Sequence, residues 1–403
     1  KDFPGLARII IKTTDASAAA PFGAANWRDL GRDPDPTLDA ELEARTAAVV
    51  PTDAAFIMYT SGTTGFPKGV VRNHLFLRNQ VDRVRILGTT ELDIMYNYLP
   101  LFHIFGYLDG PMLSMATGNK QILVETFDPE ACLDAVEAEG VSQFSGFETH
   151  MKSLVEAQKR HARDLSSLRI GIFGAGTNSA VPIMREGLEV LKPFRPITAY
   201  GMTEIGGNAC LSFMDSNDEQ ICETSGRPCD GFDFRVIDPD TGQEQPFDVS
   251  GEIVLKSYNV MTCYYKKPEE TAKAYNADGW FLTGDMGYMR ADGFLRFLGR
   301  YKDMLKIGGE NVDPMEVEAY LQGHPDVAET AVIGHPDERL TEVAIAFIAP
   351  RPGRTPSEDD ILAFCRGKIA SFKIPRHIIF ISRLPMTSTG KVRKVDLREQ
   401  ALT

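Results

Sequence analysis

The sequence predicts an α/β protein: a large, multi-subdomain α/β domain with a β-rich subdomain, followed by a small α+β domain. The first observation is that short apolar runs alternate with segments of helical spacing between about residues 54 and 200. The second is a change to short β-rich runs with turn signals in residues 226–298. The third is a renewed alternation after Arg300, over about a hundred residues, which is enough for a small domain.

The individual elements follow from spacing and composition. The runs that read as short buried strands are residues 55–59, 94–99, 121–124, 142–146, 169–173 and 197–200. The segments with apolar residues at helical spacing are residues 128–139, 150–160 and 181–191. Strands that alternate with helices in this way favour a parallel sheet covered by helices.

The carboxy-terminal region opens with a helix-start signal. Asp313 is the expected N-cap, Pro314 the first helical residue and Glu316 the capping-box partner. Glu316 and Glu318 are therefore expected to serve as cap and surface, not as catalysts. The next elements are expected at residues 331–334, 343–348, 361–369 and 378–381. We place the boundary at residues 301–303, which divides the chain into domains 1–301 and 302–403.

Composition excludes several classes of protein. The formal net charge of -13 argues against nucleic-acid binding, which requires clustered Lys and Arg. No apolar run approaches the roughly 18 to 20 residues of a membrane span, so we expect a soluble, cytoplasmic protein. The six cysteines form no C-x-x-C pair and predict neither a zinc site nor a disulfide framework.

Residues 59–69 have the composition of a phosphate-binding loop. Glycines at 62, 65 and 69 allow the backbone to approach an anion, and Lys68 supplies positive charge. We expect this loop where a strand passes into a helix. The spacing is not that of a P-loop, because Gly62 and Gly65 are too close and Lys68 is followed by Gly69. The candidate nucleotide ligands here are Thr60, Ser61, Gly62, Thr63, Thr64 and Lys68.

The loop resembles the signature loop of the adenylate-forming (ANL) superfamily, which includes acyl-CoA synthetases, luciferases and adenylation domains of peptide synthetases. Further blocks resemble the motifs of that superfamily in the same order: residues 100–106, 173–176, 200–204, 251–253, 279–285, 299–303, 308–311 and 389–391. The resemblance covers about residues 50–400. It implies an AMP-forming acid–thiol ligase that uses ATP and Mg²⁺ to make an acyl-adenylate and then a thioester with coenzyme A.

The resemblance also implies roles for single residues. Glu204 would bind Mg²⁺, Thr203 would donate to the α-phosphate and Tyr200 would stack on adenine. Asp285 would accept the ribose hydroxyls, with Arg300 on the other side of the ribose. The remaining residues expected around the nucleotide are Gly174, Ala175, Gly176, Gly201 and Met202. Gly174 and Gly176 do not form a dinucleotide fingerprint, because Ser179 stands where a third glycine belongs.

Four further residues are assigned by resemblance. Lys391 would bridge the incoming carboxylate and the α-phosphate, and Lys302 would be the hinge between two domain orientations. His103 would gate the acid pocket, although a lone histidine in an apolar segment is usually a core residue. Gly309 would let the pantetheine arm of coenzyme A pass.

The chain departs from the superfamily pattern at three places. Only 54 residues precede Ala55, so the amino-terminal part of the large domain is expected to be absent, or present as a separate fragment. Glu148 stands where proline is common and Cys263 where glycine is usual. A carboxylate beside the acyl pocket disfavours a simple fatty chain unless it is paired or faces solvent.

Two other functions stay open, together with homo-oligomer formation. One is delivery of the acyl group to a carrier-protein thiol. The other is an inactive, AMP-binding interaction protein.

Overall fold

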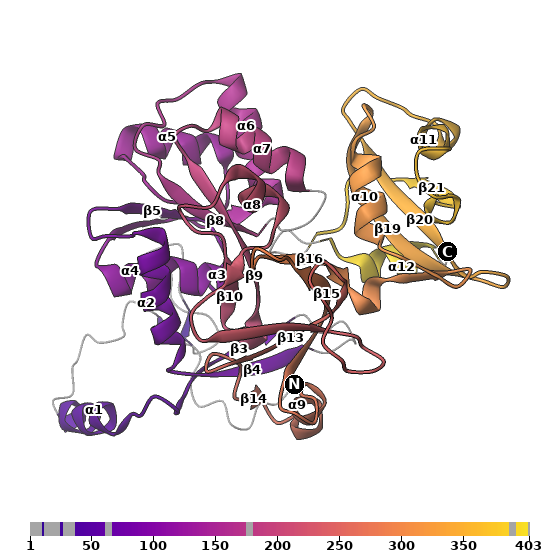
Figure 1. The fold of residues 1–403 in the computed structure, drawn as a ribbon. Helices are drawn as coiled ribbons and strands as arrows, with labels where there is room; N and C mark the ends of the chain where they lie inside the picture. The colour runs from indigo at the N-terminus through magenta and orange to yellow at the C-terminus, as the bar shows by residue number, and fades with distance from the viewer. Residues whose placement is uncertain are drawn as a thin grey trace. The chain divides into compact units, whose positions relative to one another are not determined.

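The computed structural model describes the backbone of residues 10–11 and 25–26, and residues 37–60, 67–174, 180–386 and 392–401 (Figure 1). Two compact units are Lys1–Asp53 and Ala54–Thr403. In the first unit, β1 (Ile10–Ile11) pairs in parallel with β2 (Ala25–Asn26), and α1 (Thr37–Ala48) has no buried residue. Everything below concerns the second unit.

A mainly parallel sheet forms the first part of this unit. Its strand order is β11-β10-β9-β8-β7, in which β7, β8 and β9 are parallel and β10 and β11 are antiparallel additions. Gln143 bridges β5 and β8 in parallel, and β5 pairs with β6. The strands are β5 (Ile94–Asn97), β6 (Lys120–Leu123), β7 (Gly146–Phe147), β8 (Ile170–Gly174), β9 (Arg195–Met202), β10 (Gly207–Leu211) and β11 (Arg227–Pro228).

Helices α5 (Pro129–Glu139), α6 (Glu148–Arg160) and α7 (Val181–Val190) alternate with these strands and pack beside one another (Figure 1). The predicted alternation is therefore confirmed. The one weak prediction is the strand at 142–146, which is reduced to the bridge at Gln143 and the two-residue β7. Local chemistry explains α5: Asp128 caps it by accepting from the N–H groups of Glu130 and Ala131, and Gly140 ends it in the left-handed region at φ 71°.

Two antiparallel sheets follow. One has the order β14-β4-β3, from β3 (Ala54–Thr60), β4 (Lys68–Asn73) and β14 (Cys263–Tyr264). The other has the order β12-β13-β15-β16, from β12 (Phe232–Ile237), β13 (Gly251–Ser257), β15 (Phe281–Met289) and β16 (Leu295–Arg300). The expected strand-to-helix passage at residues 59–69 is wrong. Thr60 pairs with Lys68, so the loop joins two antiparallel strands.

The last sheet has the order β18-β17-β20-β19, with β21 parallel to β20. It comprises β17 (Leu305–Ile307), β18 (Glu310–Val312), β19 (Val327–Asp337), β20 (Thr341–Pro350) and β21 (His377–Phe380), with α10 (Pro314–Gln322), α11 (Glu358–Cys365) and α12 (Lys394–Ala401). Asp313 caps α10 through the Met315 N–H, as predicted. Glu316 does not complete a capping box; its carboxylate binds Lys373 instead. Glu318 is not merely a surface residue, because it accepts from the Val332 N–H and pairs with Lys394.

The remaining elements are short connections around these sheets. They are α2 (Phe76–Leu87), α3 (Ile104–Tyr107), η3 (Leu108–Met112), α4 (Leu113–Thr117), η5 (Thr203–Ile205), α8 (Asp218–Glu223), α9 (Pro268–Lys273), η6 (Tyr301–Asp303) and η7 (Ser371–Lys373). No described helix combines the length and the apolar character that a membrane span needs. All six cysteines are free thiols.

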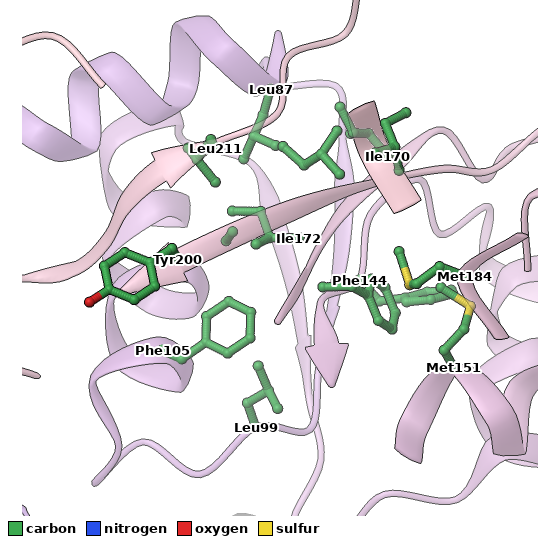
Figure 2. Close-up of a cluster of buried hydrophobic side chains, with 14 of the residues drawn as sticks. Leu87, Leu99, Phe105, Phe144, Met151, Ile170, Ile172, Met184, Tyr200 and Leu211 are labelled. Carbon is green, nitrogen blue, oxygen red and sulfur yellow. The ribbon is translucent and has the colours of Figure 1, made fainter. Parts of the chain in front are cut away.

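The largest hydrophobic core lies between the parallel sheet and its helices (Figure 2) and continues into the sheet of β12, β13, β15 and β16. Phe144, Ile170 and Ile172 from the sheet side pack with Met151 of α6 and Met184 of α7. Tyr200 of β9 lies at one end of the side chains drawn in Figure 2, with its oxygen directed away from the aliphatic ones. The core therefore fixes the end of β9, where the candidate site begins.

Candidate active site

Some of the predicted site residues lie outside the described ranges: Ser61, Gly62, Thr63, Thr64, Ala175, Gly176 and Lys391. The strands on either side of them are described. Thr60 ends β3 and Lys68 begins β4, while Gly174 ends β8. Met386 and Val392, on either side of the segment with Lys391, form an antiparallel bridge. The roles expected for the residues outside the described ranges stay predictions.

Tyr200 and Arg300 both contact the carboxylate of Asp285. The Tyr200 hydroxyl donates to Asp285 Oδ2 at 2.8 Å, and Arg300 Nε lies 3.0 Å from Oδ1. Asp285 on β15 is the register partner of Arg300 on β16, so the sheet itself brings the second pair together. Asp285 is only 3% exposed. A carboxylate held from both sides has a fixed orientation, and its two acceptor oxygens suit a diol such as ribose.

The environment of Tyr200 favours its role as a donor. Burial, and secondarily the charge of Asp285, raise the pKa of Tyr200 well above its ordinary value, so the hydroxyl keeps its proton. Its ring centroid lies 5.8 Å from that of Phe297 and 6.2 Å from that of Phe234. The ring is thus already packed by protein, and its stacking on adenine stays a prediction.

Glu204 lies in η5, the single turn between β9 and β10, and is buried beside Thr203. Its carboxylate Oε1 accepts from the Tyr264 hydroxyl at 2.9 Å. Its main-chain oxygen accepts from Arg72 Nη1 at 3.0 Å and from the Met261 N–H. Sequence reasoning identified Glu204 but neither Tyr264 nor Arg72. The one signal for Arg72 is a charged residue directly after the apolar pair at positions 70–71.

A magnesium ion bound with a nucleotide fits this donor set. Within the described residues, no group of three or more His, Cys, Asp or Glu side chains could hold a metal. Mg²⁺ is commonly bound by one or two carboxylates together with substrate phosphates. The buried Glu204 carboxylate, which makes a single side-chain hydrogen bond among the described residues, suits that arrangement.

Lys68 already has an anionic partner in the protein. Its Nζ lies 2.7 Å from Glu270 Oε2, on α9, and 4.8 Å from the centroid of the Tyr264 ring. The ammonium group of Lys68 holds the pKa of Glu270 below its ordinary value. A nucleotide phosphate bound to Lys68 would replace this carboxylate. Sequence reasoning missed Glu270, because nothing in a Pro-Glu-Glu helix start identifies a partner 202 residues away.

The glycines of the site have two different explanations. A Cβ on Gly201 would lie 1.8 Å from the main-chain oxygen of Gly207, so glycine is needed for the close pairing of β9 and β10. Gly308 and Gly309 form the turn between β17 and β18 with φ of 61° and 90°. This turn accounts for Gly309 without coenzyme A, and its predicted role stays untested. Met202, which ends β9, is half-buried beside Thr203.

His103 is the N-cap of α3, where its Nδ1 accepts from the Phe105 N–H at 3.3 Å. Its ring lies 6.3 Å from the ring of Phe147. Phe147 also contacts His150, whose pKa is lowered by burial to about 4. The position of His103 beside an aromatic cluster is compatible with the predicted gate, which stays a prediction.

Lys302 is exposed in η6, between the last strand of one sheet and the first strand of the next. Lys302 therefore lies in the connection between β16 and β17. The hinge role and the boundary at residue 302 stay predictions.

Comparisons with known proteins agree with this chemistry. The sequence profile of the AMP-binding enzyme family matches residues 6–265, and that of the AMP-binding enzyme C-terminal domain matches residues 316–391. The chain is 37% identical to the putative acyl-CoA synthetase YngI of Bacillus subtilis, over 94% of this chain and 69% of that protein. It is also 37% identical to a methyl-dioxo-octahydro-indenyl-propanoyl:CoA ligase of Rhodococcus jostii, over 99% of this chain and 75% of that protein.

Solved structures give the same result. The ATP-bound MatB of Rhodopseudomonas palustris superposes with a TM-score of 0.81 at 31% identity, over 87% of this chain and 69% of that chain. The o-succinylbenzoate CoA synthetase of Bacillus subtilis, in complex with its acyl-adenylate, gives a TM-score of 0.77 at 30% identity, over 88% of this chain and 71% of that chain.

Proposed function

The chain belongs to the AMP-binding enzyme family, and from this premise we propose that it is an ATP-dependent acyl-CoA synthetase. In the first step a carboxylate oxygen of the acid attacks the α-phosphorus of ATP, and pyrophosphate leaves as the acyl-adenylate forms. In the second step the sulfur of coenzyme A attacks the acyl carbon, and AMP leaves. The relatives named as acyl-CoA synthetases and CoA ligases support this reaction.

The chemical difficulty of the first step is that two anionic groups must meet. Positive charge has to offset their repulsion in the transition state. Lys68 would bind the phosphates, Thr203 would donate to the α-phosphate, and Lys391 would bridge the two reacting groups. Mg²⁺, bound through Glu204 and phosphate oxygens, would supply further charge neutralisation.

The observation that carries the proposal is the orientation of Asp285. Its carboxylate is buried, ionically paired with Arg300 and hydrogen-bonded to Tyr200. Burying a carboxylate costs free energy that an ion pair offsets only in good geometry, so the orientation of this group is tightly defined. A carboxylate has two acceptor oxygens, which suit the two hydroxyls of a ribose.

Pyrophosphate exchange with a panel of carboxylic acids tests the adenylation step directly. Exchange with at least one acid, together with consumption of coenzyme A, is the expected result. Exchange without consumption of coenzyme A would favour the alternative, transfer to a carrier-protein thiol. Absence of exchange with every acid, in folded protein, would contradict the proposal and return the chain to a non-enzymatic AMP-binding function.

The assignment of Glu204 and Asp285 to the nucleotide makes a sharper prediction. Glu204→Gln and Asp285→Asn should raise the KM for MgATP while they leave the order of preference among acids unchanged. Initial rates at several concentrations of MgATP, for each acid, measure both quantities. A changed order of acids would show that these carboxylates contact the acid instead.

Partners and location are predicted more coarsely. The carboxylic acid, ATP and coenzyme A are the proposed substrates, while a carrier protein and a homo-oligomer stay predictions. The cytoplasmic location also stays a prediction, because one group of relatives is named as mitochondrial.

A further inference from the structure

Glu204 depends on its surroundings for a fixed position. It lies in a three-residue 3-10 turn, closed by one bond from the Gly206 N–H to the Thr203 main-chain oxygen at 3.2 Å. So short a turn contributes little rigidity of its own. The orientation of its carboxylate must therefore come from contacts with other parts of the chain.

The backbone of this turn is held by Arg72 of β4. Arg72 Nη1 donates to the Glu204 main-chain oxygen at 3.0 Å, and Nη2 donates to the main-chain oxygen of Asn259 at 2.7 Å and to its side-chain oxygen. The guanidinium therefore links the Glu204 turn to the segment that precedes β14. Arg72 is 1% exposed, and in the described residues it has no ion pair with a carboxylate.

A buried cation that is satisfied only by neutral oxygens is costly. Replacing buried charged groups by well-packed apolar side chains is often neutral or stabilising, so stability alone does not explain Arg72. The cost is better explained by a requirement for this turn to keep one position.

The carboxylate itself is held by Tyr264 of β14. The Tyr264 hydroxyl donates to Glu204 Oε1 at 2.9 Å, and Tyr264 is 8% exposed. Tyr264 pairs with Val70 in the register of β14 and β4, so it belongs to the same three-stranded sheet as Arg72. Lys68 begins β4. One sheet thus holds the proposed phosphate lysine and both contacts to Glu204.

We propose that Arg72 and Tyr264 are positioning residues that fix Glu204 for the magnesium ion bound with ATP. Arg72 fixes the main chain of the turn, and Tyr264 fixes the rotamer of the carboxylate. The inference rests on the proposed function, specifically on Glu204 as the magnesium ligand. Partners that orient a metal ligand affect metal affinity strongly even though they do not touch the metal.

Tyr264→Phe is the decisive variant, because it removes one hydroxyl and keeps the ring beside Lys68. Calorimetry should show binding of ATP in excess Mg²⁺ weakened about tenfold, the lower end of the effect of such partners on metal sites. Binding of ATP with Mg²⁺ removed by chelation should be unchanged. The control Tyr320→Phe loses a comparable hydrogen bond, to the Phe364 main-chain oxygen at 2.8 Å, and should alter neither affinity.

Arg72→Lys keeps the charge but loses the simultaneous hydrogen bonds to Glu204 and Asn259. It should weaken binding of MgATP more than binding of metal-free ATP. The control Arg163→Lys changes another buried arginine, one that pairs with Glu130 and Asp134, and should lower the Tm without a difference between the two affinities. If Arg72→Lys does not fold, Tyr264→Phe still decides.

The outcomes separate this inference from the function on which it rests. If Glu204→Gln leaves the magnesium dependence of ATP binding unchanged, the assignment of Glu204 is wrong. If Glu204→Gln removes that dependence but Tyr264→Phe weakens both forms of ATP equally, or neither, the positioning role is wrong. If Tyr264 acts only by positioning Glu204, the double variant Glu204→Gln/Tyr264→Phe should bind MgATP no more weakly than Glu204→Gln alone.

Discussion

His150 is a half-buried histidine whose neighbours are aromatic rings. The ring centroids of Phe127 and Tyr98 lie 4.7 and 5.0 Å from its own, and its Nδ1 accepts from the Phe147 N–H. Burial lowers the pKa of His150 from 6.5 to about 4. The neutral ring therefore caps the start of α6 and packs with the aromatic cluster at physiological pH.

This burial predicts acid sensitivity. Because the unfolded chain binds the proton first, the contribution of His150 is fully present above pH 6.5 and is lost as the pH falls toward 4. The loss should be on the order of 3 kcal/mol. His150→Asn, which retains an acceptor for the Phe147 N–H, should flatten the pH dependence of the free energy of unfolding in this range.

Denaturant titrations at several pH values between 4 and 7 measure this difference. The control is His161→Asn, at the exposed carboxy end of the same helix. Parallel curves for wild type and His150→Asn would contradict the prediction.

At the scale of single residues, the sequence indicates candidate site residues but not their side-chain partners. The Thr-Gly-Asp run drew attention to Asp285, but the hydrogen bond between Asp285 and Tyr200 joins residues 85 positions apart. The contacts of Glu204 with Arg72 and Tyr264 arise only when β14, β4 and the turn after β9 pack together. Side-chain partners of this kind depend on tertiary packing, which no local spacing contains.

At the scale of elements, the hairpin of β9 and β10 determines where Tyr200 and Glu204 lie. Gly201 pairs with Asn208 in this hairpin, and a Cβ there would overlap the Gly207 main-chain oxygen. Gly201→Ala should therefore separate the strands, with a loss of about 1–3 kcal/mol in the free energy of unfolding. Binding of ATP should weaken as well, because both side chains move.

Gly242→Ala is the matched control. Gly242 has φ of 71° with nothing within 4 Å of a Cβ, so the substitution costs only backbone strain of about 1 kcal/mol. Chemical denaturation and calorimetry with ATP measure the two effects. Unchanged ATP binding in Gly201→Ala would argue that the hairpin does not position the site.

The elements also show why the passage at residues 59–69 was predicted wrongly. Glycine-rich loops at helix starts are a common phosphate site, and that precedent favoured a helix after the loop. The residues themselves, Val70 and Val71, are β-branched and suit a strand. Both are buried in β4, and the helix starts only at Phe76. Most strands and helices elsewhere were predictable, because their periodicity was not in conflict with such a precedent.

At the scale of the whole molecule, substitutions of Lys391 and Lys302 test whether the two half-reactions use different arrangements of the chain. If Lys391 contacts only the α-phosphate, Lys391→Ala should reduce adenylation by ~10²- to 10³-fold, the loss seen for one transition-state donor. The variant, given synthetic acyl-adenylate and coenzyme A, should still release the thioester at nearly the wild-type rate. Comparable losses in both half-reactions would contradict the hypothesis that the chain alternates between two arrangements.

Lys302→Pro should shift the equilibrium between the two proposed arrangements of the chain. Tyr301 begins the 3-10 turn η6, and a residue before proline disfavours that helical conformation. The variant should therefore disfavour the arrangement that contains this turn and change the ratio of the two half-reaction rates. Lys306→Pro, within β17, is not a suitable control because it also loses a hydrogen bond to Glu342. Lys302→Ala is suitable, and an equal ratio in both variants would argue against a hinge.

If Lys68 binds the phosphates as proposed, its ion pair with Glu270 makes nucleotide binding an exchange of anions at one cation. The Glu270 carboxylate, which ATP would displace, still has Lys273, 3.8 Å away, as a neighbour. Added salt screens the pair that breaks as well as the pair that forms, so the two effects partly cancel. The affinity for MgATP should accordingly vary little with ionic strength. Glu270→Gln should bind MgATP more tightly in dilute buffer and lose that advantage as salt is added, which calorimetry across a salt series would measure.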